Sequence, residues 1–365
     1  PKQSQDLFAE AWPVNTSEFD QGVSWSIDGQ TLAHIYPVPT LGNDLVSELS
    51  LYDTNTWKVT RKYQPRGLTG TASKIAFSPV MHDDNKEQIA TFDGRVAHLW
   101  KLGEGAHLAE FRSHETVFSA DFSSDRMLVA TASDSLRIFN SDERSSNHGS
   151  TVVRMTNAHA GRVEEVEFTD KAGSYDFLSL GGDRKIKLWN WDWKRDAVAN
   201  PPVNAKVTIN LEEDQPNTNT TWDKSLQWTS SLEWSPTESL IAATFAGNLH
   251  LYRKQDEVFS RIELQLPEDY NVKFNCCSIS ADEKMIAAGG VRLLEDGRTL
   301  ESFSAVWTLQ GDQPPLLSAT FKGKHSPNRN SNQVAGTTAV EFGPDGFTLL
   351  TGGTDGTLLE WDWEE

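Results

Sequence analysis

Short runs that alternate apolar and polar residues fill the chain, and long helical patterns are nearly absent. Gly, Asp, Asn and Pro separate these runs, and they are the residues that favour turns. A period of two along the sequence is typical of strands that bury one face. The pattern therefore predicts an all-β fold built from many short strands.

One group of strands recurs seven times along the chain. Its first strand appears as VSWSIDG at 23–29 and again as VEFGPD at 340–345. A strand of small residues follows each time, and then a third strand that ends in an aromatic residue. These aromatic residues are Tyr52, Trp100, Phe139, Trp189, Tyr252, Trp307 and Trp361. A pattern that repeats in this way predicts a repeat architecture in which each copy is one structural unit.

Two of the repeats carry a characteristic set of polar residues beside the aromatic one. The fourth repeat has His159, Ser179, Asp183 and Trp189. The seventh has Thr351, Asp355 and Trp361, with His325 as a candidate fourth member. In these residues and spacings the chain resembles the WD-repeat (WD40) family, over essentially its whole length. The resemblance implies that each set is a structural hydrogen-bonded tetrad, and a catalytic Asp183 is the alternative.

Three other repeats depart from the tetrad pattern. Asp134 lies one residue too close to Phe139, and Asp93 lies one residue too far from Trp100. Asn248 stands where the fifth repeat is expected to carry Asp. Complete tetrads are therefore not expected in these repeats.

The resemblance also implies a fold class: all-β, with a seven-bladed β-propeller of four-stranded antiparallel blades in a single domain over residues 1–365. The last repeat ends at EWDWEE, after only three strands. Residues 6–14 are expected to supply its fourth strand, and this pairing would close the ring and cover two sheet edges. The blades are expected at about 20–66, 70–112, 114–156, 159–212, 228–268, 271–322 and 325–365.

Three tryptophans, Trp189, Trp191 and Trp193, alternate along one strand and the residues after it. Alternate residues of a strand face the same side. One interpretation is that all three pack against the neighbouring blade. The other is that Trp193, near the strand end, remains exposed as a docking residue for a partner.

The charge of the chain limits the classes of partner. The formal net charge is −19, which repels phosphate backbones and anionic lipid surfaces, so neither a nucleic acid nor a membrane is expected. No apolar run approaches the ~18 residues of a membrane span, and the N-terminus lacks the pattern of a secretory signal. The two cysteines, Cys276 and Cys277, are adjacent and unsuited to a disulfide framework. We expect a cytoplasmic protein.

The sequence motifs of the common catalytic and cofactor-binding sites are absent from the sequence. The stretch MHDDNK at 81–86 has consecutive acidic residues whose side chains diverge, which favours a solvated turn over a metal site. We therefore expect no enzymatic activity, no metal and no cofactor.

Four long insertions, at 36–48, 212–228, 291–303 and 322–336, are expected on one rim of the propeller, over blades five, six, seven and one. Long loops in compact domains are often functional, although drift could also explain them. A local basic patch is expected from Arg292, Arg298, Lys322, Lys324, His325 and Arg329. Arg side chains of such a patch suit carboxylate groups. Trp222 and Trp228 are either binding residues or plugs beneath their loop.

These features predict a non-enzymatic scaffold that binds another protein or a peptide segment through this rim. A structural assembly subunit is one alternative. A propeller hydrolase with a carboxylate or metal site at the central channel is another, because a fold does not dictate function. The chain could also be a module of a larger polypeptide or complex.

Overall fold

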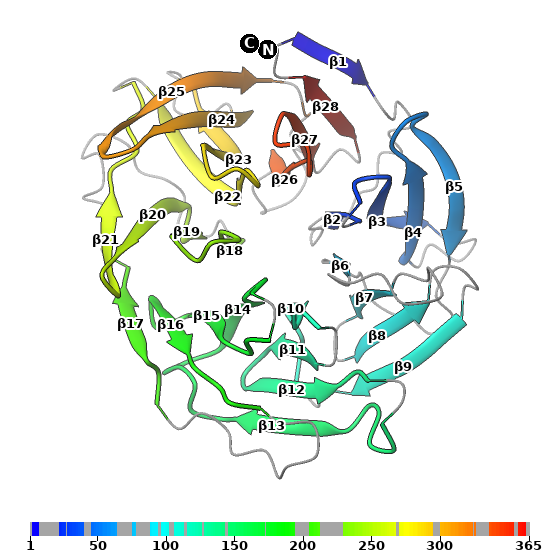
Figure 1. Ribbon diagram of the computed structural model, residues 1–365. Coiled ribbons are helices and arrows are strands. Elements are labelled where there is room, and N and C mark those ends of the chain that lie inside the picture. Colours follow the sequence, from blue (N-terminus) through cyan, green and yellow to red (C-terminus); the bar gives the residue numbers. More distant parts are fainter. Residues whose placement is uncertain are drawn as a thin grey trace. The chain divides into compact units, whose positions relative to one another are not determined.

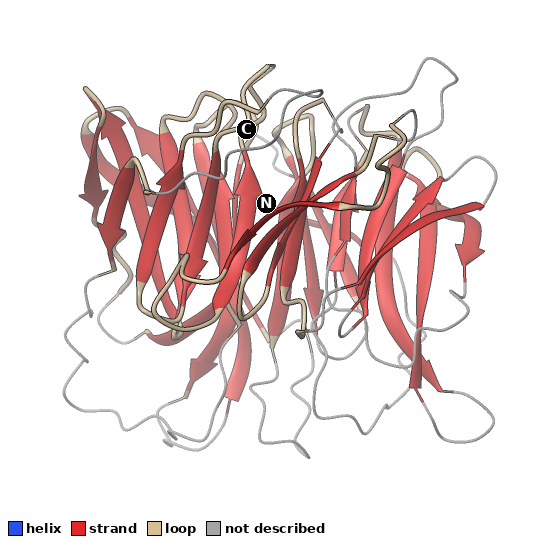
Figure 2. Ribbon diagram, turned by 90° about the horizontal axis from the view of Figure 1, so that it is seen from below, coloured by secondary structure: helices blue, strands red, loops and turns tan. Residues whose placement is uncertain are grey.

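The computed structural model describes most of the strand-forming residues of the chain. The described residues are 2–6, 22–26, 28–39, 45–63, 75–77, 88–93, 96–101, 106–112, 115–125, 128–142, 145–171, 173–193, 204–211, 229–267, 270–294, 300–323, 325, 336–353 and 357–362. Within these ranges every regular element is a β-strand, as the colouring of Figure 2 shows. The all-β class expected from the alternating sequence is confirmed.

The chain divides into two compact units, Ser24–Leu211 and the combination of Pro1–Val23 with Glu212–Glu365. The first unit holds four sheets, each of four consecutive strands that Figure 1 labels in order. These are β2 (Gly22–Trp25), β3 (Thr31–Pro39), β4 (Leu45–Asp53) and β5 (Lys58–Tyr63); β6 (Ile75–Phe77), β7 (Gln88–Asp93), β8 (Val96–Lys101) and β9 (Ala106–Arg112); β10 (Ser119–Phe122), β11 (Leu128–Ala132), β12 (Leu136–Asn140) and β13 (Thr151–Met155); and β14 (Val163–Phe168), β15 (Phe177–Gly181), β16 (Lys185–Trp189) and β17 (Val207–Asn210).

The second unit holds three sheets, two of which follow the same consecutive order. These two contain β18 (Ser231–Trp234), β19 (Leu240–Phe245), β20 (Asn248–Gln255) and β21 (Val258–Ile262), and then β22 (Asn271–Ile279), β23 (Met285–Leu293), β24 (Leu300–Gln310) and β25 (Gln313–Lys322). The third sheet has the order β1-β28-β27-β26 and joins β26 (Thr337–Phe342), β27 (Thr348–Gly353) and β28 (Leu358–Asp362) to β1 (Lys2–Asp6).

The expected seven-bladed propeller is corrected by this topology. Only six sheets are blades of four consecutive strands. The remaining sheet is composite, because the last repeat provides three strands and β1 is added antiparallel to β28. The added strand also differs from the expected one: it is Lys2–Asp6, whereas residues 7–14 lie outside the described ranges.

Two of the expected loop insertions are largely strand. The segment at 36–48 extends β3 and β4, whose register runs from Thr31↔Asp53 to Pro39↔Leu45. The segment at 291–303 likewise extends β23 and β24 to the pair Leu293↔Leu300. Both segments contain Val and Leu next to the strands that they extend, and these residues suit a β-ladder. The other two insertions lie mostly outside the described residues.

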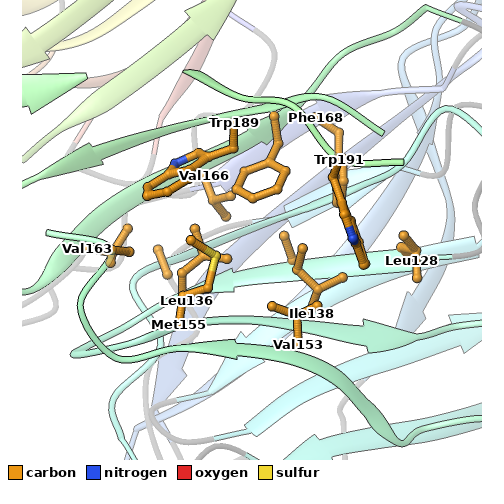
Figure 3. Close-up of a cluster of buried hydrophobic side chains, with 14 of the residues drawn as sticks. Leu128, Leu136, Ile138, Val153, Met155, Val163, Val166, Phe168, Trp189 and Trp191 are labelled. Carbon is orange, nitrogen blue, oxygen red and sulfur yellow. The ribbon is translucent and has the colours of Figure 1, made fainter. Parts of the chain in front are cut away.

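Within each unit, adjacent sheets pack face to face through a layer of buried apolar side chains. In the first unit, the largest layer joins the sheet β10–β13 to the sheet β14–β17. It includes Ile138 and Val153 from one sheet, and Val166 and Trp189 from the other. Figure 3 shows these side chains directed toward one another from the two sheets. Burial of apolar surface stabilises such a layer by roughly 25 cal/mol per Å² removed from water.

The three alternating tryptophans belong to this layer. Trp189, Trp191 and Trp193 are buried, with exposed fractions of 3%, 5% and 6%. Tyr175 lies edge-on to Trp193, with ring centroids 5.0 Å apart, and Trp191 lies 6.3 Å from Trp193. The first of the two interpretations therefore holds for Trp193, which packs inside the first unit.

Hydrogen bonds between inner strands also join adjacent sheets. The Phe168 backbone N–H donates to Asp121 Oδ2 at 2.7 Å. At the matching position of the second unit, the Phe342 N–H donates to Ser278 Oγ at 3.2 Å. Each bond connects the first strand of one repeat to the first strand of the next. The two acceptors, Asp121 and Ser278, occupy the same position in their repeats.

Replacing Trp193 with Ala is expected to lower the free energy of unfolding by about 3–5 kcal/mol, the usual cost of a large-to-small change in a core. Chemical denaturation followed by circular dichroism measures this loss. Phe347→Ala is the matched control, because Phe347 is 52% exposed and its truncation leaves no cavity. An equal loss in both variants would contradict the packing role of Trp193.

Asp121 predicts a pH dependence of stability. Burial raises its pKa from 3.8 to about 7, although the Phe168 N–H opposes the shift. The folded chain therefore holds this proton more tightly than the unfolded chain. The resulting stabilisation is complete below a pH of about 4 and is lost as the pH rises through about 7.

The variant Asp121→Asn keeps an acceptor for the Phe168 N–H but carries no titrating carboxyl. Its free energy of unfolding, measured against that of the wild type, is expected to improve as the pH is raised from mildly acidic to mildly alkaline. A difference that stays constant over this interval would contradict the shifted pKa of Asp121.

Candidate partner-binding site

The fourth repeat forms the complete polar chain that the resemblance implied. His159 Nδ1 lies 2.7 Å from Asp183 Oδ1, and His159 Nε2 lies 2.7 Å from Ser179 Oγ. The Trp189 indole N–H donates to Ser179 Oγ at 2.8 Å. Asp183 accepts a further bond from the Ala160 N–H at 3.0 Å. Each polar group of the tetrad therefore has a partner.

The order Asp183–His159–Ser179 also matches that of a hydrolytic triad, so its environment decides its role. The side chain of Ser179 is completely buried, and its oxygen accepts the Trp189 indole N–H. Burial lowers the pKa of His159, against the opposing effect of Asp183, and this favours the neutral ring. A nucleophile needs access to a substrate, which Ser179 lacks. The geometry is that of a structural tetrad.

Gly181, the first glycine of the pair before Asp183, makes room for the ring of His159. A Cβ atom on Gly181 would lie 2.3 Å from His159 Cγ, which is far inside contact distance. Gly353 has the same relation to His325, at 2.4 Å from its Cγ. The glycine pairs GGD and GGT in the sequence therefore reflect close packing of the imidazole against the backbone.

The composite sheet repeats this arrangement. His325 Nε2 lies 3.0 Å from Thr351 Oγ1, and the Trp361 indole N–H donates to the same oxygen at 3.0 Å. The other ring nitrogen of His325 lies 2.8 Å from Thr357 Oγ1. Asp355 lies outside the described residues. His325 is only 2% exposed, so its ring acts as a tetrad member and is not part of the basic surface patch.

The remaining repeats show parts of the pattern. Trp100 donates to Thr91 Oγ1 at 2.9 Å, so this bond forms despite the altered spacing of Asp93. Trp307 faces a strand with no hydroxyl at the matching position, and its indole N–H donates instead to the Gln265 carbonyl at 3.0 Å. A buried indole N–H therefore finds an acceptor in each of these repeats, as the cost of leaving it unpaired requires.

The charged surface site lies at the end of the sheet β22–β25 where β22 begins and β23 ends. Arg292 of β23 places its guanidinium carbon 4.6 Å from the centroid of the Tyr270 ring. Lys322 of β25 places its ammonium 4.1 Å from the same centroid and donates a short hydrogen bond to the Tyr270 hydroxyl. The sequence predicted that Arg292 and Lys322 lie near each other, and the structure brings them together on Tyr270.

The rest of the sheet holds this cluster, which consists of Tyr270, Arg292, Glu301 and Lys322, in position. Arg292 pairs across the ladder with Glu301, and its Nη1 lies 4.0 Å from Glu301 Oε2. The ring of Phe303 meets that of Tyr270 edge-on, with centroids 5.5 Å apart. Phe303 is fully buried. The cluster thus rests on the apolar core of its sheet.

The hydrogen bond from Lys322 is the main cause that lowers the pKa of the Tyr270 hydroxyl. A cation beside an aromatic face is attracted by the ring quadrupole, by roughly 0.5–2 kcal/mol. Two cations and one carboxylate leave this cluster with a net positive charge. Arginine and lysine in such a place can bind a carboxylate or a phosphate group of a ligand.

The other candidate residues are placed as follows. Arg298, Lys324, Arg329, Trp222 and Trp228 lie outside the described residues. The sequence analysis missed Tyr270 as a site residue. The available signal in the sequence was the position of Tyr270, which lies just before β22 and two residues before Val272.

Two properties of the described part of the chain bear on its function. Among those residues, no group of three or more His, Cys, Asp or Glu side chains is arranged to hold a metal ion. The same residues include no helix that is long and apolar enough to cross a membrane.

The tetrad makes a quantitative prediction. Ser179→Ala is expected to lower the free energy of unfolding by about 1–3 kcal/mol, because it leaves the Trp189 indole N–H and the His159 ring without their shared partner. Ser179→Thr keeps the hydroxyl found at the matching position of the composite sheet, and we expect it to retain most of the stability. Thermal and urea unfolding compare the two variants. A Thr variant as unstable as the Ala variant would assign the loss to steric fit and not to the hydroxyl.

Comparison with known proteins supports the repeat assignment. The family model of the WD40 repeat (WD domain, G-beta repeat) matches residues 105–138 and 319–362. No curated protein matches the sequence. The crystal structure of the Cps50 (Swd1) β-propeller domain from Myceliophteria thermophila is similar, with a TM-score of 0.65, 12% identity, and coverage of 95% of this chain and 98% of that one.

A chain in the crystal structure of a mitotic checkpoint complex is also similar. Its TM-score is 0.64 at 14% identity, over 100% of this chain and 96% of that one. At such low identity these structures show the fold alone. The two matched segments show that the chain contains WD40 repeats, and the similar structures show that its fold is a β-propeller.

Proposed function

We propose that the chain is a non-enzymatic scaffold that binds an acidic segment of another protein at the cluster of Tyr270, Arg292, Glu301 and Lys322. The convergence of Arg292 and Lys322 on one tyrosine ring is the observation that carries this proposal. Proteins with WD40 repeats typically act as interaction scaffolds. One similar chain was solved within a mitotic checkpoint complex, which favours a protein partner.

The charge distribution favours an acidic ligand group at this place. The whole chain carries a formal charge of −19, so most of its surface repels an acidic partner. Arg292 and Lys322 counter this field locally, with Glu301 as the acidic residue of the cluster. An acidic segment would therefore find a local attractive site at the end of the sheet β22–β25, and this short-range attraction weakens as salt is added.

The strands that carry Arg292 and Lys322 favour binding of an acidic segment because they hold these side chains in place. Arg292 and Lys322 are strand residues, and their ladders continue to Glu301 and Phe303. In the core of the same sheet, the rings of Phe274 and Trp307 pack against each other, with centroids 6.0 Å apart. Side chains held on strands lose less conformational entropy on binding than those of a mobile loop. Arg298, Lys324 and Arg329 follow these strands in sequence.

Two alternatives use the same fold differently. A structural assembly subunit would associate through an extended surface and would not depend on Arg292 and Lys322. A propeller hydrolase would need a reactive group open to a substrate, whereas the Asp183–His159–Ser179 chain is buried in the fold. A cytoplasmic location, suggested by the acidic sequence and the two cysteines, remains part of the proposal.

The double variant Arg292→Gln and Lys322→Gln tests the site. Binding of a fluorescein-labelled flexible peptide rich in Asp and Glu is measured by fluorescence anisotropy. Loss of both cations is expected to weaken binding about tenfold or more, which corresponds to ~1.4 kcal/mol. The affinity of the wild type is also expected to fall as salt is added.

The matched control is Lys171→Gln with Lys284→Gln, which makes the same change in charge on turns away from the cluster. This control is expected to bind the acidic peptide as the wild type does. Equal weakening in both double variants would assign the binding to overall charge and overturn the proposed site. Absence of binding to the wild type would favour an assembly subunit.

A further inference from the structure

The outer strand of the first sheet, β5, is exposed along nearly its whole length. The strand order β2-β3-β4-β5 ends at this strand. Every residue from Lys58 to Lys62 is exposed, and Tyr63 is half-buried. Because consecutive strand residues point to opposite sides, exposure of the whole run means that both faces of β5 are open to solvent.

The other outer strands differ from β5 in exposure or in composition. In β13, Val153 and Met155 are buried in the core between two sheets. In β17 and β21, exposed residues alternate with partly buried ones. The strand β25 contains Pro314 and Pro315, which lack the N–H that a further strand requires. Among the outer strands whose burial is described, β5 is the one with five consecutive exposed residues and no proline.

The composition of β5 suits pairing with an acidic strand. Its sequence, KVTRKY, contains Lys58, Arg61 and Lys62 and no acidic residue. Val59 and Thr60 are β-branched, and Val59 is 39% exposed. Three cations in six residues contrast with the charge of −19 on the whole chain. The strand thus combines high β propensity, an exposed apolar group and a local positive charge.

The attachment of β5 to its own sheet leaves the outer edge available. Its inner edge pairs with β4, from Lys58↔Asp53 to Tyr63↔Leu49. A register shift opposite Leu51 and Tyr52 is bridged by the Thr60 hydroxyl, which donates to the Leu51 carbonyl at 3.1 Å. Glu48 of β4 holds the Lys62 ammonium at 2.7 Å. These contacts keep the strand in the sheet while its side chains remain at the surface.

We propose that β5 is a docking edge for an extended acidic segment of a partner protein, which adds to the sheet β2–β5 as a fifth strand. Main-chain hydrogen bonds to the outer edge would supply affinity, and acidic side chains opposite Lys58 and Arg61 would supply specificity. An apolar residue of the added strand would cover Val59.

Charge distinguishes this partner from other occupants of an open edge. Lysine-rich edges prevent pairing with a second copy of the same strand, because like charges placed opposite each other repel. The same cations attract an acidic strand. A nucleic acid has no peptide backbone with which to extend the ladder, and the acidic chain repels its phosphates. An acidic polypeptide satisfies both the backbone and the charge requirement.

The proposal is tested with a fluorescein-labelled peptide of alternating Glu and Val and with its Lys–Val counterpart. Fluorescence anisotropy measures both dissociation constants for the wild type and for the variant Lys58→Glu with Arg61→Glu. The wild type is expected to prefer the acidic peptide. The variant is expected to lose about tenfold or more in affinity for that peptide and to gain affinity for the basic one.

Two controls separate this mode of binding from general attraction. The variant Lys171→Glu with Lys284→Glu makes the same change in charge on exposed turns and is expected to retain the preference of the wild type. An acidic peptide that is N-methylated at alternate residues keeps its charge but cannot complete the ladder, and its binding is expected to be lost. Circular dichroism verifies that each variant is folded.

These measurements are made in the background of Arg292→Gln with Lys322→Gln, which removes the cations of the cluster around Tyr270, so that the outcomes report on β5. A reversal of peptide preference in the β5 variant, together with loss of binding by the methylated peptide, supports strand addition. Binding that survives methylation, or that falls equally in the control variant, overturns it. Dimerisation of the wild type that the β5 variant abolishes would instead assign this edge to a second copy of the chain and also overturn the proposal.

Discussion

A buried polar group must keep a hydrogen-bond partner, and this requirement governs how the sheets are built. Trp189 fills the layer between two sheets, but its indole N–H would destabilise that layer if it were unpaired. Ser179 accepts this N–H and also meets His159, which in turn meets Asp183 at the surface end of the sheet. The composite sheet solves the same problem with Thr351 and His325. Gly181 and Gly353 leave room for the two histidine rings that take part in these chains.

This requirement also decides which residues remain for function. The residue types that suggest catalysis, Ser179, His159 and Asp183, are engaged with one another inside the fold. Chemistry that can reach a partner lies instead at strand ends and on outer strands. At one such place Arg292 and Lys322 meet on Tyr270, and at the other β5 carries a row of exposed cations. Both are local exceptions on a strongly acidic chain, so recognition of acidic groups is the property that they share.

The sequence predicted the strands, the repeat and the role of Trp189, because alternation and spacing follow directly from the geometry of a β-ladder. It placed the added strand at residues 6–14 instead of Lys2–Asp6, because polar residues such as those of β1 give no hydrophobic signal. It also predicted loops where β23 and β24 continue, since strand length depends on pairing with a neighbour. His325 could not be assigned to one role, and the position of Tyr270 depends on contacts between three strands that no local pattern encodes.

We propose that the tetrads serve stability while the surface cations serve recognition. The most direct test measures two quantities on the same variants, the free energy of unfolding and the dissociation constant for an acidic peptide. For His159→Ala, the account predicts a lower free energy of unfolding and an unchanged dissociation constant for the folded protein. For Arg292→Gln with Lys322→Gln, the free energy of unfolding is expected to stay close to that of the wild type, while the dissociation constant for the acidic peptide is expected to rise. A His159 variant that keeps its stability but loses binding would contradict the account.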